Sequence, residues 1–236
     1  MKSSSKLIVA LDVKDLKRAK ELVDNLYPTV KIFKIGSQLF TAYGPRAVEL
    51  VQRKGARVFL DLKFHDIPNT VAKAAVSATD LGVFMFTVHC LGGFQMMRLV
   101  KEASYKEAKR LGVQKPLVLG VTLLTSMDQR DLISLGINRR IGDQVLCLAK
   151  LAKKAGLDGV IASPQEIRLI RKTLGSSFII VTPGIRPFWA KTYDQRRTLK
   201  PKEAIDAGAD YIVIGRPIIE AKVPLRAAEK IIEEIS

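Results

Sequence analysis

Residues 58–70 read Val58-Phe59-Leu60-Asp61-Leu62-Lys63-Phe64-His65-Asp66-Ile67-Pro68-Asn69-Thr70. The stretch begins as an apolar run, which is typical of a buried strand. Asp61 and Lys63 are two positions apart, so their side chains share one face of such a strand. Leu60, Leu62 and Phe64 then point to the other face. The pattern predicts a strand that is packed against apolar neighbours on one side and carries charged chemistry at its end.

Short apolar runs like this one recur along the whole chain, with amphipathic stretches between them. The eight predicted strands are 7–11, 31–35, 58–62, 84–88, 117–124, 159–162, 178–181 and 211–214. Apolar residues at helical spacing follow the first run, at Leu16, Ala19, Leu22, Val23 and Leu26, and close the chain, at Leu225, Ala228, Ile231, Ile232 and Ile235. Nearly continuous apolar strands that alternate with helices predict a parallel sheet covered on its outside.

Eight such units in 236 residues predict the α/β class and a (β/α)8 TIM barrel, a fold of typically about 250 residues. An open doubly wound sheet would be favoured by Gly-x-Gly-x-x-Gly after the first strand, where this chain has Leu11-Asp12-Val13. No low-complexity segment or linker divides the chain. We therefore expect a single domain over residues 1–236.

Composition excludes several classes of protein. The chain is 47% apolar and 26% charged, which excludes a mainly disordered chain, a collagen and a disulfide-stapled miniprotein. Lys and Arg number 39 and Asp and Glu 23, so the net charge is +16. Such an excess favours an anionic partner, which could be nucleic acid, an anionic membrane surface or a phosphorylated small molecule.

The sequence predicts a cytoplasmic protein. Cys90 and Cys147 lie far apart and fit no zinc spacing, so reduced thiols are the simplest interpretation. No segment approaches the roughly 18–20 apolar residues of a membrane helix. The apolar run 7–11 ends at Asp12, too early for a signal peptide.

Polar or glycine residues follow most of the predicted strands. In a barrel these strand ends converge on one face, where active sites lie. Nearby carboxylates stabilise the ammonium form of Lys63, which suits it to proton donation or charge stabilisation rather than to service as a base or Schiff-base nucleophile. A purely structural salt bridge is the alternative. His65 and His89 are each open to a catalytic or a hydrogen-bonded structural role.

The loops after the last two strands predict an anion site. They contain Thr182-Pro183-Gly184-Ile185-Arg186-Pro187 and Gly215-Arg216-Pro217. In barrels these loops often bind phosphate. Arg186 and Arg216 can each offer a planar fork to phosphate oxygens. Gly184 and Gly215 allow close backbone approach, and Pro217 suits the first position of a helix. The polar connection 188–200 could close over the bound group, and surface arginines without a ligand are the alternative interpretation.

With these motifs, the chain resembles the orotidine 5′-phosphate decarboxylase family, of the bacterial type, over essentially its whole length. The resemblance is carried by Asp61-x-Lys63-x-x-Asp66 within 60–70, and by 181–187, 194–197 and 214–217. One departure is His89-Cys90-Leu91-Gly92-Gly93, where the family often has His-Ala-Ser-Gly-Gly. The resemblance implies conversion of orotidine 5′-phosphate to UMP in de novo pyrimidine synthesis, with no metal and no cofactor.

The resemblance also implies roles for individual residues. Lys63 would protonate C6 of the pyrimidine as CO2 leaves, and Asp61 would lie near the departing carboxylate. Lys34 and Asp12 would bind the ribose, and Asp66 would come from the neighbouring subunit of a homodimer. The implied catalytic residues are Lys63, Asp61, Asp66 and Lys34, and the implied substrate-binding residues are Asp12, Lys34, Ile67, Thr70, Thr125, Pro183, Arg186, Gln195, Gly215 and Arg216.

Two alternatives remain. Hexulose-phosphate synthase and keto-gulonate-phosphate decarboxylase share the Asp-x-Lys-x-x-Asp motif but use Mg²⁺, held partly by an acidic residue on the second strand. That position here is Lys34, whose ammonium would repel a divalent ion. A nucleic-acid-binding protein is disfavoured because aromatic residues make up only 6% of the chain and no reading motif is present. We expect neither nucleic acid nor a membrane as a partner.

Overall fold

The computed structural model describes residues 3–190 and 198–236. Eight parallel strands pair in sequence order, and the first also pairs with the last, which closes the sheet into a barrel. The strands are β1 (Leu7–Ala10), β2 (Ile32–Gly36), β3 (Arg57–Phe64), β4 (Met85–His89), β5 (Leu117–Val121), β6 (Gly159–Ile161), β7 (Ile179–Thr182) and β8 (Tyr211–Ile214). The predicted (β/α)8 barrel is confirmed.

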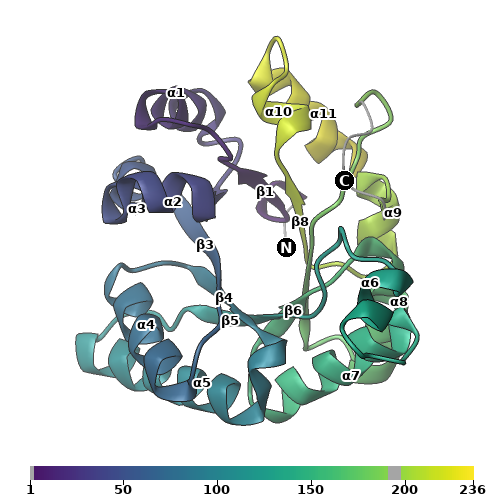
Figure 1. The fold of residues 1–236 in the computed structure, drawn as a ribbon. Coiled ribbons are helices and arrows are strands. Elements are labelled where there is room, and N and C mark those ends of the chain that lie inside the picture. The colour runs from purple at the N-terminus through teal and green to yellow at the C-terminus, as the bar shows by residue number, and fades with distance from the viewer. Residues whose placement is uncertain (1–2, 191–197) are drawn as a thin grey trace.

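Helices surround the barrel as a ring (Figure 1). They are α1 (Leu16–Leu26), α2 (Ser37–Tyr43), α3 (Pro45–Gln52), α4 (Pro68–Asp80), α5 (Gly93–Leu111), α6 (Gln129–Ser134), α7 (Ile141–Lys154), α8 (Ile167–Leu174), α9 (Pro201–Asp206), α10 (Arg216–Ile219) and α11 (Pro224–Glu234). None of the described helices is long and apolar enough to cross a membrane.

The predicted strands match the observed ones closely, with one informative difference. The apolar run 117–124 extends beyond β5, which ends at Val121. Leu123 and Leu124 continue into the loop and line a cavity at the end of the barrel. Leu123 is also buried in the core between sheet and helices, whereas Leu124 is exposed.

The core has two layers, which follow from the alternation of side chains along each strand. Inward-facing residues fill the barrel, among them Ile8, Phe59, Met85, Leu119 and Tyr211. Outward-facing strand residues and the apolar helix faces form the larger layer between sheet and helices. The barrel is thus a packed core, and only its carboxyl end is free to hold a site.

Local sequence explains where the first helices begin and end. The side chain of Asp15 accepts a hydrogen bond from the Arg18 backbone N–H at 2.8 Å and caps α1. The predicted apolar stripe of this helix is buried against the barrel. Gly44, with φ of 55°, separates α2 from α3, because a left-handed conformation there favours glycine.

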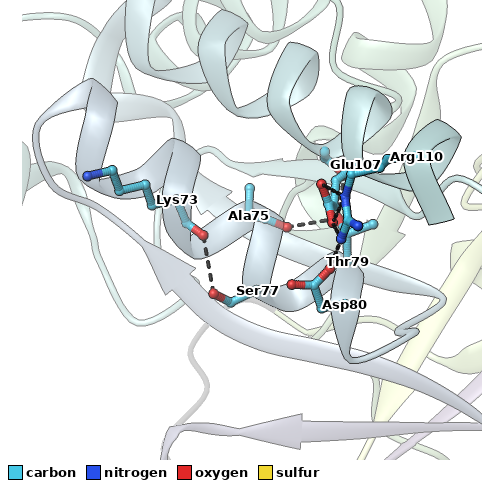
Figure 2. A network of polar contacts seen from close by, with 8 residues as sticks. Lys73, Ala75, Ser77, Thr79, Asp80, Glu107 and Arg110 are labelled. Atoms are coloured by element: carbon cyan, nitrogen blue, oxygen red, sulfur yellow. Dashed lines mark hydrogen bonds and ion pairs between the residues drawn. The ribbon is translucent and has the colours of Figure 1, made fainter.

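Helices α4 and α5 are joined by polar contacts on their facing sides (Figure 2). The buried Thr79 hydroxyl donates to the Ala75 carbonyl at 2.8 Å and lies 3.0 Å from Ser104 Oγ. Arg110 pairs with Glu107 on its own helix and lies 3.9 Å from Asp80 of α4. A shared hydrogen bond with Glu107 raises the pKa of the Asp80 carboxyl. These contacts join the C-terminal half of α4 to α5.

Candidate active site

A cavity of about 470 Å³ opens at the carboxyl end of the barrel. Most of the residues predicted for the site line it, and they come from six different strand ends or loops. They are Asp12, Lys34, Asp61, Lys63, Thr125, Pro183, Arg186, Gly215 and Arg216. The barrel therefore brings together motifs that are up to about 200 positions apart in the sequence.

Four charged side chains form one alternating array along the cavity wall. Lys34 Nζ lies 3.1 Å from Asp12 Oδ1 and 3.6 Å from Asp61 Oδ2. Lys63 Nζ lies 2.9 Å from the same Asp61 oxygen. The order Asp12, Lys34, Asp61, Lys63 places each lysine beside at least one carboxylate.

Burial and charge act in opposite directions on the inner members of the array. Burial alone would raise the pKa of the Asp61 carboxyl, but the charges of Lys34 and Lys63 and the hydrogen bonds that it accepts lower that pKa overall. Burial alone would lower the pKa of Lys34, but Asp61 and Asp12 raise it overall. Both side chains are only 12% exposed. Each is therefore held charged by the other.

Glycine leaves room for the outer pair of the array. A Cβ at Gly36, at the end of β2, would lie 3.0 Å from Lys34 Nζ and 3.2 Å from Asp12 Oδ1. Both contacts are tighter than ordinary packing allows. The Lys34-x-Gly36 spacing therefore lets the Lys34 side chain extend along its own strand, past Gly36, to reach Asp12.

The β3 end departs from regular strand geometry at the lysine. Lys63 has φ of 53°. Among the described residues it is the only one other than glycine with a positive φ. Its backbone N–H donates to Thr87 Oγ1 at 2.9 Å, and the Thr87 hydroxyl donates to Asp61 Oδ1 at 3.0 Å. Thr87 was missed in the sequence analysis, because it lies inside an apolar run and no motif marks it.

The inner wall of the cavity is apolar. Inward-facing strand residues form it, namely Ala10, Phe59, Val121, Ile161 and Val213. Strand alternation alone could have identified them. Apolar walls exclude water and strengthen the electrostatic interactions of the charged array beside them.

The residues predicted to bind an anion line the same cavity. Arg186, Gly215 and Arg216 line it together with Pro183. Gly184 has φ of 78°, so the turn after β7 favours glycine. The backbone N–H of Arg186 donates to the Leu199 carbonyl at 2.9 Å, which ties the two ends of the connection 188–200 together.

One detail of this predicted anion site differs from expectation. Pro217 is the second residue of α10 rather than the first. A Cβ at Gly215 would meet neighbours only at ordinary contact distance, the nearest being Ala10 Cβ at 3.4 Å. The protein's own packing therefore does not require glycine there. Glu220, at the end of α10, also lines the cavity and was missed by the sequence analysis.

Some predicted residues do not join the cavity of their own chain. Asp66, Ile67 and Thr70 are exposed beside it, and Asp66 Oδ1 accepts a hydrogen bond from the Ile67 backbone N–H at 2.6 Å. Gln195, with Asp194, Arg196 and Arg197, lies outside the described residues.

The two histidines stack on each other beside the charged array. Their ring centroids are 5.2 Å apart and the ring planes differ by 17°. His89 Nδ1 accepts a hydrogen bond from the Leu91 backbone N–H at 3.3 Å. Burial, with smaller contributions from the charges of His65 and Lys63, lowers the pKa of His89. Neither ring lines the cavity, which favours the structural interpretation for both.

The carboxylates of the site already have cationic partners. Asp12 and Asp61 both contact ammonium groups. Within 3–190 and 198–236, no group of three or more His, Cys, Asp or Glu side chains is arranged to hold a metal ion.

The fold and the site define a class of protein, the (β/α)8 barrel whose carboxyl end holds a lysine–aspartate array and two arginines in one cavity. The chain matches the model of the orotidine 5′-phosphate decarboxylase / HUMPS family over residues 5–231. It is 52% identical over 231 residues to an orotidine 5′-phosphate decarboxylase of Geotalea uraniireducens, and the match covers 98% of this chain and 95% of that protein. The match at 50% identity to the enzyme of Moorella thermoacetica covers 100% and 94%.

A solved structure shows the same architecture. The orotidine 5′-phosphate decarboxylase of Lactobacillus acidophilus superposes with a TM-score of 0.85 at 38% identity, and the match covers 98% of this chain and 99% of that one. The chain belongs to the orotidine 5′-phosphate decarboxylase / HUMPS family and is an enzyme of that family. The resemblance found in the sequence is confirmed.

Proposed function

We propose that the protein converts orotidine 5′-phosphate to UMP and CO2, the decarboxylation of pyrimidine biosynthesis, without a metal or an organic cofactor. The observation that carries this proposal is the geometry of Lys63. Its ammonium nitrogen lies 2.9 Å from Asp61 Oδ2 at the wall of a cavity that also contains Arg186 and Arg216. A fixed proton donor and an anion site thus share one cavity of suitable size for a nucleoside monophosphate.

Each part of the substrate has a matching group in the cavity. The phosphate is assigned to Arg186, Arg216 and the Gly215 backbone, whose donors suit its oxygens. The ribose is assigned to the Asp12–Lys34 pair, which can accept and donate hydrogen bonds to hydroxyl groups. The pyrimidine is assigned to Thr125, and the apolar wall lies between these polar groups.

The chemical step follows from the charged array. The bond between C6 and the carboxylate breaks, CO2 leaves, and the electron pair stays on C6. The Lys63 ammonium stabilises that charge and then donates its proton to C6, leaving a neutral amine that solvent reprotonates. Asp61 holds the ammonium in place, and its negative charge lies where the substrate carboxylate would approach.

Lys34 favours this reaction over the metal-dependent chemistry of related barrels. Its ammonium group lies between the Asp12 and Asp61 carboxylates, at 3.1 and 3.6 Å. Those two carboxylates are the groups at this position that could ligate a divalent cation. A cation placed there would meet a buried positive charge.

We infer that the active enzyme is a homodimer in which Asp66, Ile67 and Thr70 complete the site of the neighbouring subunit. Support comes from their exposure beside the cavity mouth, where the apolar Ile67 side chain is 67% exposed. Large exposed apolar residues next to a functional site are typical of an interface. Leu91 and Leu124 add further exposed apolar surface.

We propose that the protein acts in the cytoplasm. Cys90 and Cys147 are both free thiols, which supports a reducing compartment. The proposed partner is the anionic nucleotide, and neither nucleic acid nor a membrane is required for the reaction.

The decisive experiment is to add orotidine 5′-phosphate to the purified protein in the presence of EDTA and follow the pyrimidine absorbance. We expect turnover that is unchanged by added Mg²⁺. Absence of turnover under both conditions would overturn the assignment. Turnover only after Mg²⁺ is added would instead identify the protein as one of the metal-dependent relatives.

A further inference from the structure

Thr87 lies behind the active site and contacts both central members of the charged array. It sits in the middle of β4, has no exposed surface and does not line the cavity. Its hydroxyl oxygen accepts a hydrogen bond from the Lys63 backbone N–H at 2.9 Å. The same hydroxyl donates to Asp61 Oδ1 at 3.0 Å. One side chain on a different strand therefore joins the backbone of the lysine to the carboxylate of the aspartate.

The pairing of β3 with β4 explains why Thr87 can do this. Leu60 pairs with Phe86, and the next pair is Phe64 with Val88. Three residues of β3, namely 61–63, therefore lie opposite the single residue Thr87. The excess residues break the backbone ladder at this point, and the Thr87 hydroxyl takes the place of a ladder acceptor for the Lys63 N–H.

The bulge also places Lys63 in a costly backbone conformation. Its φ of 53° lies in the left-handed region, which is rare for residues other than glycine. Such a conformation is unfavourable for a residue with a side chain and persists only where the surroundings hold it. The Lys63 backbone N–H donates to Thr87 Oγ1 at this irregular point of the strand.

The hydroxyl also determines how Asp61 presents its charge. A hydroxyl has one proton to donate, and this one is committed to Oδ1. The other oxygen, Oδ2, is left for the ammonium groups of Lys63 and Lys34. The two oxygens of one carboxylate are thus assigned to different partners.

We propose that Thr87 is a positioning residue for decarboxylation, whose hydroxyl fixes the Lys63 backbone and the Asp61 carboxylate relative to each other. This inference rests on the proposed function and deepens it, since it identifies the side chain that holds the proton donor in position. Thr87 acts through Asp61 and Lys63 and does not touch the substrate. Its role belongs to the chemical step rather than to substrate binding.

Two substitutions separate the hydroxyl from the packing of the side chain. Thr87→Val keeps the shape but removes the hydroxyl, and Thr87→Ser keeps the hydroxyl but removes the methyl group. We expect Thr87→Val to lower kcat roughly 10- to 100-fold, because small misplacements of reacting groups cost about that much. KM for orotidine 5′-phosphate and Kd for UMP should stay within about threefold of the wild-type values. Thr87→Ser should keep kcat within about threefold.

A second measurement does not depend on activity. Hydrogen exchange of the Lys63 backbone amide, followed by NMR in the full-length protein, should be at least about tenfold faster in Thr87→Val and unchanged in Thr87→Ser. Thr87→Ala supplies the same comparison if Thr87→Val does not fold. If the wild-type protein lacks turnover, the proposed function fails, while the exchange rates still decide whether the hydroxyl holds Lys63.

The proposal is overturned by any of three results. The first is a kcat for Thr87→Val within about threefold of wild type. The second is an equal loss of kcat in Thr87→Val and Thr87→Ser, which would assign the effect to packing. The third is a Lys63 amide that exchanges at the wild-type rate in Thr87→Val.

Discussion

The ammonium group of Lys34 lies 3.6 Å from Asp61 Oδ2, the oxygen that also contacts Lys63 at 2.9 Å. One carboxylate oxygen on β3 therefore faces two cations, one from its own strand and one from β2. Removing one member of such a buried set leaves another charge uncompensated, which costs more than the pair itself contributes. The array, which we propose as the chemical centre, is thus also a sensitive point of the fold.

Lys63→Ala should lower kcat/KM by at least about 10³-fold, because it removes the proton donor and the charge that faces C6. The variant should bind UMP with nearly wild-type affinity and keep the wild-type circular dichroism spectrum. Arg53→Ala, which removes a remote exposed cation, is the matched control and should retain full activity. Near-normal activity of Lys63→Ala would remove this lysine as the donor.

Arg186→Ala and Arg216→Ala should each raise KM for orotidine 5′-phosphate. Hydrogen bonds to a charged group contribute about 1.5–3 kcal/mol, which corresponds to a change of roughly 10- to 100-fold. Isothermal titration with UMP and with uridine measures the effect directly. Affinity for uridine, which lacks the phosphate, should be unchanged. An equal loss for both ligands would show that the arginines do not act on the phosphate.

The stability of the protein should fall in acid partly because of Asp61. Its folded-state pKa is lowered, so its contribution is present above the unfolded-state pKa of about 3.9 and is lost as pH falls through the folded-state value. One such group changes the free energy of unfolding by at most about 1.4 kcal/mol per pH unit. Denaturant titrations between pH 6 and 3 should show a shallower decline for Asp61→Asn. The control Asp206→Asn should keep the wild-type slope, and identical slopes for all three proteins would contradict the prediction.

Mixing two inactive variants tests the shared site. Lys63→Ala and Asp66→Ala chains, refolded together, should form hybrid dimers in which one of the two sites has both residues. Random pairing in a two-fold dimer predicts recovery of about a quarter of wild-type activity. Each variant refolded alone should remain inactive. Hybrid dimers that form without activity would show that Asp66 does not act across the interface.

The two cysteines should differ sharply in reactivity. Cys90 is fully buried, and burial raises the pKa of its thiol to about 12, whereas Cys147 is exposed. An aromatic disulfide reagent at pH 8 should therefore modify one thiol in the native protein and two in the denatured protein. Cys147→Ser should leave none reactive in the native state. Rapid modification of Cys90 would mean that the barrel opens near β4.

The net charge of +16 has a limited part in this picture. It is consistent with an anionic substrate, but within 3–190 and 198–236 the basic residues that line the cavity are Lys34, Lys63, Arg186 and Arg216. Most of the basic residues are elsewhere, on the protein surface. Their effect is a modest attraction of anions that salt would screen.

The sequence by itself determined the elements and the chemistry. Apolar runs at strand length, alternating with helical periodicity, were sufficient to predict eight strands, since continuous apolar strands are stable only in a covered parallel sheet. The polar residues at the strand ends, such as Asp61, Lys63 and Arg216, indicated a site. Burying a charged side chain within an apolar pattern costs free energy unless the charge is paired or hydrogen-bonded.

Only the tertiary structure decided how those groups meet. The Lys34–Asp61 contact depends on the register of β2 with β3, and no local pattern encodes a distance between strands. The role of Thr87 depends on three residues of β3 lying opposite one of β4. A threonine within an apolar run is locally compatible with any strand, so its hydroxyl acquires a function only when packing buries it against Asp61 and the Lys63 backbone.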